Sequence, residues 1–331
     1  MDDRFGRAHR IVSRHLSAIG QTFFVESPWV GLLAVAALVA VGPHLALAGM
    51  VTSILARLTA ERAGASSSFL ATGLVELNGW FLGLACATFF AVGPGLVAAV
   101  LLGGPLAAAL SIVMQRLLAT WDVPLLVGPY VPSFWLLWSA LAVFPWARQA
   151  VLPVVPAAVA SPWVLVALGG LRGVGQIFFL PNAGFGLALA VAVSIADWRL
   201  GPAMVGASVA SVAIAHVAGA PAWQVEQGLA GFTPALVAVA ALRGFAGLGA
   251  GSVAVAVVGA PFLEAAALRL AGSVGLHALS ASYIVLVWTF AVLRPVRTAE
   301  ATRAGWSAPR AGPAAPRAGA AAPRARIFEN G

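Results

Sequence analysis

Long apolar stretches dominate this chain and limit the folds that it can adopt. They recur with little relief from residue 30 to residue 292, and several exceed the roughly 20 residues that a helix needs to cross a bilayer. Residues 79–113, 123–144 and 274–293 are examples. The chain is 61% hydrophobic and 9% charged, far from the usual mix of a soluble protein. A β-barrel would need alternating segments of about ten residues, and none occur. The sequence therefore predicts an all-α polytopic membrane protein.

The second constraint is an internal repeat with an offset of 155 residues. The pairs at this offset are QTFF at 21–24 with QIFF at 176–179, GL at 31–32 with GL at 186–187, and GL at 73–74 with GL at 228–229. Tyr130 and Trp135 match Tyr283 and Trp288 with a shift of two residues. Repeats in an apolar chain indicate a pseudo-symmetric transporter or channel whose site lies where the two halves meet.

The repeat length and the charges together predict the topology. About five spans of roughly 22 residues fit into each repeat, and an odd number requires consecutive halves with opposite orientations. Arginines precede the first apolar run and follow the last, at Arg14 and Arg294 for example. By the positive-inside rule both termini are cytoplasmic, which agrees with ten crossings. We expect two inverted repeats of five transmembrane helices, each with a re-entrant pore half-helix, around Gly73 and Gly228.

The chain divides into four parts. Residues 1–20 form a cytoplasmic or interfacial segment, residues 21–148 the first repeat, and residues 149–295 the second repeat. Residues 296–331 repeat Ala-Pro-Arg-Ala without apolar content, and we expect this cytoplasmic tail to be disordered. The net charge of +8 lies largely in the two ends and suits an anionic membrane surface better than nucleic acid.

Gln21 and Gln176 are the first candidates for a site. A primary amide inside a membrane protein is costly unless it makes hydrogen bonds, and it offers both a donor and an acceptor. One such residue can simply link two helices, but two at matched positions, each followed by two phenylalanines, indicate paired ligands. Phe24 and Phe179 lie three residues further on and should share the helical face of the glutamines. Facing rings beside polar groups suit a flat solute.

These elements resemble the urea transporter family. The resemblance rests on QxxF followed by SPWVGLL at 27–33, on the segments that begin at Gly73 and Gly228, and on a box that ends in Trp in each half. It covers residues of about 15–295. It implies a homotrimer in which each protomer has its own pore, and passive urea conduction between carbonyl groups and stacked Phe pairs in a bacterial inner membrane.

The resemblance also implies a set of path residues. Gln21 and Gln176 match the polar pair at the two ends of the filter, and the second position is often Glu in relatives. Leu77, Phe81 and Val127 depart from the family pattern, whereas Ser280 keeps a hydroxyl. The expected path residues are Gln21, Phe24, Leu77, Phe81, Val127, Gln176, Ile177, Phe179, Phe232, Leu236 and Ser280.

The same sequence features are compatible with two other kinds of transport. The alternatives are that the same fold conducts another small neutral solute, such as a short amide or ammonia, or that the chain is a coupled secondary transporter. Coupling usually requires a carboxylate at the site, and Gln176 argues against it. We expect no enzyme, cofactor or metal site, because no nucleophile–base pair, metal-ligand spacing or phosphate loop is present. The expected partners are urea, membrane lipids and further copies of the chain.

Overall fold

The computed structural model describes residues 2–150 and 161–293, and these residues are almost entirely helical. Their elements in the first half are α1 (Asp2–Gly20), the 3-10 turn η1 (Gln21–Phe23), α2 (Pro28–Val41), α3 (Pro43–Arg62), α4 (Ser67–Ala71), α5 (Leu74–Phe89), α6 (Pro94–Ala119) and α7 (Tyr130–Leu141). The predicted tail at 296–331 lies outside the described residues.

The second half repeats this order. Its elements are α8 (Pro162–Gly175), η2 (Gln176–Phe178), α9 (Ala183–Ala196), α10 (Leu200–Val217), α11 (Ala222–Gln227), α12 (Phe232–Leu242), η3 (Phe245–Gly247), α13 (Ala250–Ser273) and α14 (Ala281–Leu293). The 155-residue offset maps η1 onto η2 and α2 onto α9 residue for residue. The helix α1 therefore corresponds to α8 and belongs to the first repeat, although we expected residues 1–20 to be a separate segment.

Within residues 2–150 and 161–293, four helices are long and apolar enough to cross a membrane, and up to six if each sharply bent pair is one span. The four are α6, α10, α11 together with α12, and α13, while α5 and α14 are shorter apolar helices. The prediction of an all-helical polytopic membrane fold is confirmed, and the number of ten crossings stays a prediction.

Two sharp bends lie at the glutamine motifs. The helix that ends at Phe23 meets α2 at 85°, and the helix that ends at Phe178 meets α9 at 72°. We also expected re-entrant half-helices around Gly73 and Gly228. There the chain makes a left-handed turn, with φ of 71° and 68°, and then starts α5 and α12. The glycines permit this turn because they carry no Cβ.

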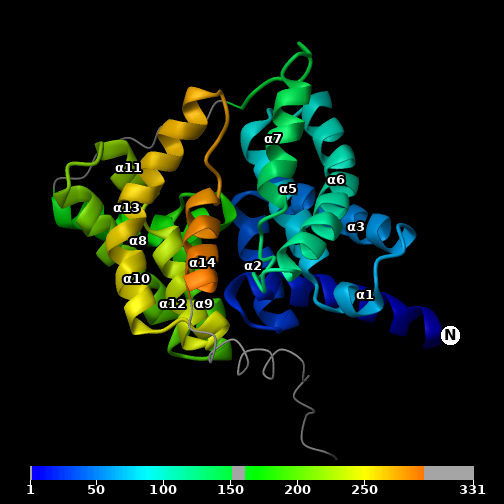
Figure 1. Cartoon of the computed structure of the whole chain (residues 1–331), viewed down its shortest axis with the longest axis horizontal. Helices are drawn as coiled ribbons and strands as arrows, with labels where there is room; N and C mark the ends of the chain where they lie inside the picture. The colour runs from blue at the N-terminus through cyan, green and yellow to red at the C-terminus, as the bar shows by residue number, and fades with distance from the viewer. Residues whose placement is uncertain (1, 151–160, 294–331) are drawn as a thin grey trace, which may run out of the picture. The chain divides into compact units, whose positions relative to one another are not determined.

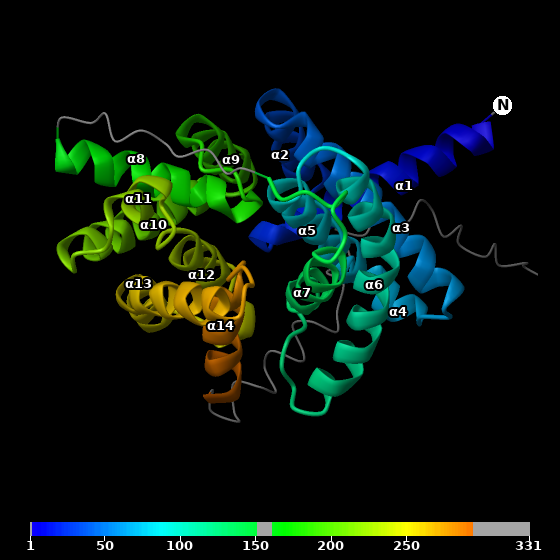
Figure 2. The ribbon, with the colours of Figure 1, turned by 90° about the horizontal axis from the view of Figure 1, so that it is seen from above.

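The two halves lie side by side (Figures 1 and 2), and reciprocal hydrogen bonds between them indicate a pseudo-two-fold relation. Trp135 Nε1 donates to His277 O at 2.8 Å, and Trp288 Nε1 donates to Pro124 O at 2.9 Å. Both the donors and the acceptors of these bonds are 153 residues apart in sequence. Reciprocal contacts of this kind are the signature of a two-fold relation. The matched helices α2 and α9 also pack against each other.

Helices α5 and α12 form the centre of their halves, because nearly all of their residues are buried. A helix that is apolar on all sides belongs in the interior. In contrast, α13 buries only Ala256, Ala260 and Glu264. Exposed tryptophans stand at helix ends, at Trp29, Trp121, Trp163 and Trp198. This placement is typical of the aromatic belts at membrane–water interfaces.

Close helix packing predicts two sensitive glycines. A Cβ at Gly31 would lie 2.7 Å from the Leu16 carbonyl carbon, and one at the matched Gly186 would lie 2.9 Å from that of Leu171. We expect alanine at either position to destabilise the fold by about 1–3 kcal/mol, because backbone would have to move. Chemical unfolding in detergent measures this. Gly206→Ala is the control, since nothing lies within 4 Å of its added Cβ; equal stability of all three variants would contradict the packing.

Candidate functional site

Each glutamine motif ends in a phenylalanine with unusual backbone geometry. Phe24 has φ 55° and ψ 30°, and Phe179 has φ 59° and ψ 20°. Their amide N–H groups donate to Gln21 O at 2.9 Å and to Gln176 O at 3.0 Å. Left-handed backbone in a bulky residue costs on the order of 1–3 kcal/mol and is concentrated at functional sites. The expectation that Phe24 continues the helical face of Gln21 is therefore wrong, because the turn stops one residue earlier.

The glutamine side chains lie against the start of the central helix of their own half. The Gln21 amide lies so close to Gly73 that a Cβ there would be 3.2 Å from Gln21 Nε2. Gln176 Nε2 donates to Gln227 O at 3.3 Å. Gly73 and Gly228 are repeat mates, and Gln227 directly precedes Gly228. The structure therefore brings together, in each half, two motifs that lie about 50 residues apart in sequence.

Phe23 and Phe178 meet at the axis between the halves. Their ring centroids are 6.0 Å apart and both side chains are fully buried. A residue that contacts its own repeat mate must lie close to the symmetry axis. The two glutamine–phenylalanine breaks consequently flank a central aromatic core. The sequence analysis did not single out these two rings, although their positions in QTFF and QIFF were matched.

Phe24 and Phe179, which are only partly buried, each contact a ring from the other half. Phe24 lies 4.5 Å from Phe245 between ring centroids, and Phe179 lies 6.3 Å from Phe89. His277 stacks on Phe89 with centroids 3.9 Å apart. Sequence reasoning missed Phe89 and Phe245 because they are 156 residues apart and so fall outside the repeat offset. His277 has proline at its matched position, so the two ends of the arrangement differ.

Ser280 and Val127 occupy matched positions with different surroundings. Tyr130 Oη donates to Ser280 Oγ at 2.5 Å and accepts from Ser280 N at 3.0 Å. The Tyr130 ring also lies 6.2 Å from that of Phe179. Val127 carries no hydroxyl, so the matched Tyr283 lacks the side-chain bond. Tyr130 thereby links the first half to two predicted path residues of the second, a role that its match with Tyr283 alone did not reveal.

The remaining predicted path residues are buried side chains. Phe81, on the second turn of α5, lies 5.5 Å from Tyr130 and 5.8 Å from Phe178 between ring centroids. The others in this group are Leu77, Val127, Ile177, Phe232 and Leu236.

A buried ion pair supports the start of α5 in the first half only. Arg57 Nη1 donates to Glu76 Oε1 at 2.7 Å and to Leu70 O at 2.7 Å, and Arg57 Nε donates to Glu61 at 2.5 Å. Glu76 lies in the first turn of α5 and is fully buried. The arginine thus joins α3, α4 and α5 directly beside Gly73. Val212 and Gly231 stand at the matched positions of Arg57 and Glu76.

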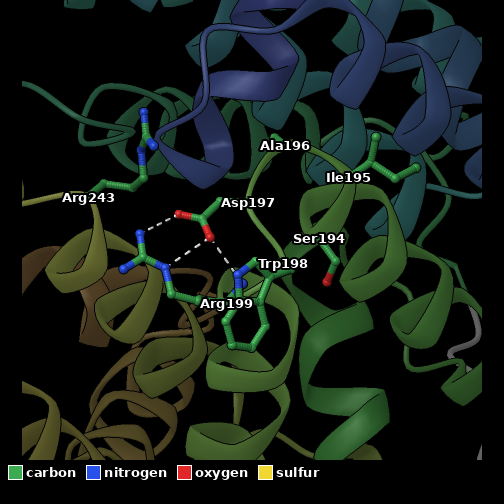
Figure 3. Close-up of a pocket in the computed structure, with 7 residues that line it drawn as sticks. All are labelled: Ser194, Ile195, Ala196, Asp197, Trp198, Arg199 and Arg243. Atoms are coloured by element: carbon green, nitrogen blue, oxygen red, sulfur yellow. Dashed lines mark hydrogen bonds and ion pairs between the residues drawn. The ribbon is translucent and has the colours of Figure 1, made fainter.

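A surface hollow of about 690 Å³ lies elsewhere and contains none of the predicted path residues (Figure 3). It is lined by residues 194–199 and Arg243. Arg199 donates to Asp197 from Nη2 at 2.8 Å and from Nε at 3.1 Å, and these hydrogen bonds lower the pKa of Asp197 to about 2. The hollow is open and Asp197 and Arg199 already pair with each other, so the glutamine motifs are the stronger candidate site.

Comparison with known proteins identifies the family. The model of the urea transporter family matches residues 12–295, which is most of the chain. The chain belongs to the urea transporter family. It is accordingly an integral membrane protein of a family that transports urea, and that family is one of transporters, not of enzymes. No curated protein matches the chain.

In this urea transporter family member we expect Arg57→Met to be strongly destabilising. The change leaves the Glu76 carboxylate buried without its partner, which costs about 3–5 kcal/mol. Arg199→Met is the matched control, because its bond to Asp197 has nearly the same length but lies at the surface. Denaturant unfolding in detergent should show a large loss for Arg57→Met and no measurable change for Arg199→Met. Equal effects would contradict the assignment.

Proposed function

We propose that this protein conducts urea passively through a path between its two halves. The observation that carries the proposal is the pair of matched glutamine–phenylalanine breaks, within a chain that belongs to the urea transporter family. The path is bounded by Gln21 and Phe24 in one half and by Gln176 and Phe179 in the other. Strained backbone at both positions supports a functional role, since such strain persists only where the surroundings enforce it.

The chemistry of urea fits this arrangement. Urea is flat, with donors and an acceptor in its plane and two faces without hydrogen-bonding groups. The rings of Phe24 and Phe179 can contact those faces, while the amides of Gln21 and Gln176 and neighbouring backbone carbonyls replace in-plane hydration. A pair of amides provides donors and acceptors without a net charge, which favours a neutral solute over an ion. The path in this proposal continues along Leu77, Phe81, Phe232, Leu236, Ile177, Val127 and Ser280.

We also propose that the protein is a homotrimer of the bacterial inner membrane with both termini in the cytoplasm. Arginine-rich ends support this orientation. Helix α13 exposes Val255, Val258 and Phe262. This apolar face can contact lipid or another copy of the chain.

Passive conduction makes a direct prediction. Urea uptake by proteoliposomes, followed by stopped-flow light scattering, should not change when the proton or sodium gradient is collapsed. No carboxylate stands at either glutamine position, so no group at the filter binds a coupling cation there. Uptake that requires either gradient would instead establish a coupled transporter. Uptake of ammonia or short amides without urea would establish a channel for another solute.

The glutamines should be required for flux. Gln21→Leu and Gln176→Leu each remove a donor and an acceptor from a dry site, which costs about 1–3 kcal/mol and lowers the rate roughly tenfold or more. Flux per folded protein in proteoliposomes measures the effect. Gln149→Leu is the control, because Gln149 is exposed. Unchanged flux in both pore variants would remove the glutamines from the path.

A further inference from the structure

Helix α13 carries one buried carboxylate on a face otherwise made of small apolar residues. Ala256, Ala260 and Glu264 are spaced four residues apart and are the buried residues of this helix. The exposed fraction of Glu264 is 5%. A carboxyl group inside a membrane protein is costly, and those that are kept face polar partners and serve a function. Glu264 lies away from both glutamine motifs in sequence and is not used in the proposed path.

Two hydroxyl groups connect Glu264 to the neighbouring helices. Ser282 Oγ, in the first turn of α14, donates to Glu264 Oε2 at 2.7 Å. Thr233 Oγ1, in the first turn of α12, is 3.3 Å from Ser282 Oγ. All three residues are buried. Thr233 directly follows Phe232, and Ser282 is two residues beyond Ser280. These hydrogen bonds therefore link the first turns of α12 and α14, which lie beside predicted path residues.

In the first half, the matched helices α5 and α7 are linked by a different residue. Asn78, the repeat mate of Thr233, donates from Nδ2 to Leu126 O at 2.9 Å and accepts from Tyr130 N at 3.0 Å. One amide therefore bridges α5 and the segment before α7 directly. A threonine side chain is shorter and carries a single polar atom, so its hydroxyl cannot reach both partners as the two separate polar atoms of the amide do.

The matched positions change together. Pro129 stands where the second half has Ser282, at an offset of 153, and the buried Ala108 stands where it has Glu264, at the offset of 156 that also relates Pro105 of α6 to Pro261 of α13. In the second half a threonine stands in place of the bridging amide, a serine in place of a proline and a carboxylate in place of an alanine. The two new groups bond to each other, and the serine reaches the threonine.

We infer that Glu264 is a positioning residue for the Ser280 end of the solute path, and that Thr233, Ser282 and Glu264 together replace the Asn78 bridge of the first half. The carboxylate accepts the Ser282 hydroxyl and so holds the start of α14, which places Ser280 against Tyr130. This inference rests on the proposed path, but it concerns residues that do not touch the solute.

The test compares three variants in proteoliposomes, with urea and N-methylurea flux measured per folded protein. Glu264→Ala should lower urea flux about fivefold or more and shift the ratio of the two fluxes. Glu264→Gln keeps an acceptor oxygen and should stay within about twofold of the wild type. The triple variant Thr233→Asn, Ser282→Pro, Glu264→Ala rebuilds the first-half bridge and should recover most of the flux that Glu264→Ala loses.

Ser208→Ala is the matched control, because it also removes a buried hydrogen bond, from Ser208 Oγ to Gly170 O, but away from Ser280. It should leave the flux ratio unchanged. The inference is overturned if Glu264→Ala conducts like the wild type, if Glu264→Gln is as impaired as Glu264→Ala, or if the triple variant recovers nothing. If Glu264→Ala does not fold, Glu264→Gln and the triple variant are each compared with the wild type, and a loss of flux of about fivefold or more in either of them overturns the inference. Failure of the proposed function is separate: the wild type would then conduct no urea, or Gln21→Leu and Gln176→Leu would conduct normally.

Discussion

The fold depends on satisfying the backbone where α1 and α8 stop inside the protein. In an apolar environment each unpaired N–H or C=O group costs several kcal/mol. The breaks solve this locally: Val25 N donates to Gly20 O, and Leu180 N donates to Gly175 O. The glycine before each glutamine makes this possible, since a Cβ at Gly20 would lie 2.7 Å from two carbonyl oxygens. The chain can therefore turn by 85° and 72° and still leave a glutamine side chain free to face the neighbouring helix.

The two-fold relation converts these local breaks into a single site. Phe23 and Phe178 meet at the axis, so the residues on either side of them are brought to opposite sides of one aromatic core. Rings from one half then pack on the other, as Phe24 does on Phe245 and Phe179 on Phe89. Reciprocal tryptophan bonds keep the halves in register. The two ends of the proposed path therefore have similar backbone geometry, and they differ in polarity only where the matched side chains differ.

The two halves differ in the residues that support the helices beside the proposed path. In the first half Arg57 and Glu76 form a buried ion pair beside Gly73, whereas the second half places Val212 and Gly231 there and packs its helices closely through glycines. In the second half Glu264 and Ser282 replace a single asparagine bridge. Both changes keep the central helix start in place by different means, which is expected if the position of the backbone matters more than the identity of the supporting residues.

The sequence by itself determined the helical membrane fold, the two halves and the glutamine motifs, because apolar length and a fixed repeat offset are local and countable properties. It did not reveal the sharp bends at the glutamine motifs, since the left-handed conformation of Phe24 and Phe179 has no signature in residue type. It also could not find Phe89, Phe245 or the link from Tyr130 to Ser280, which join residues of opposite halves. Such contacts depend on how the two-fold axis brings distant segments together, and only the tertiary structure decides that.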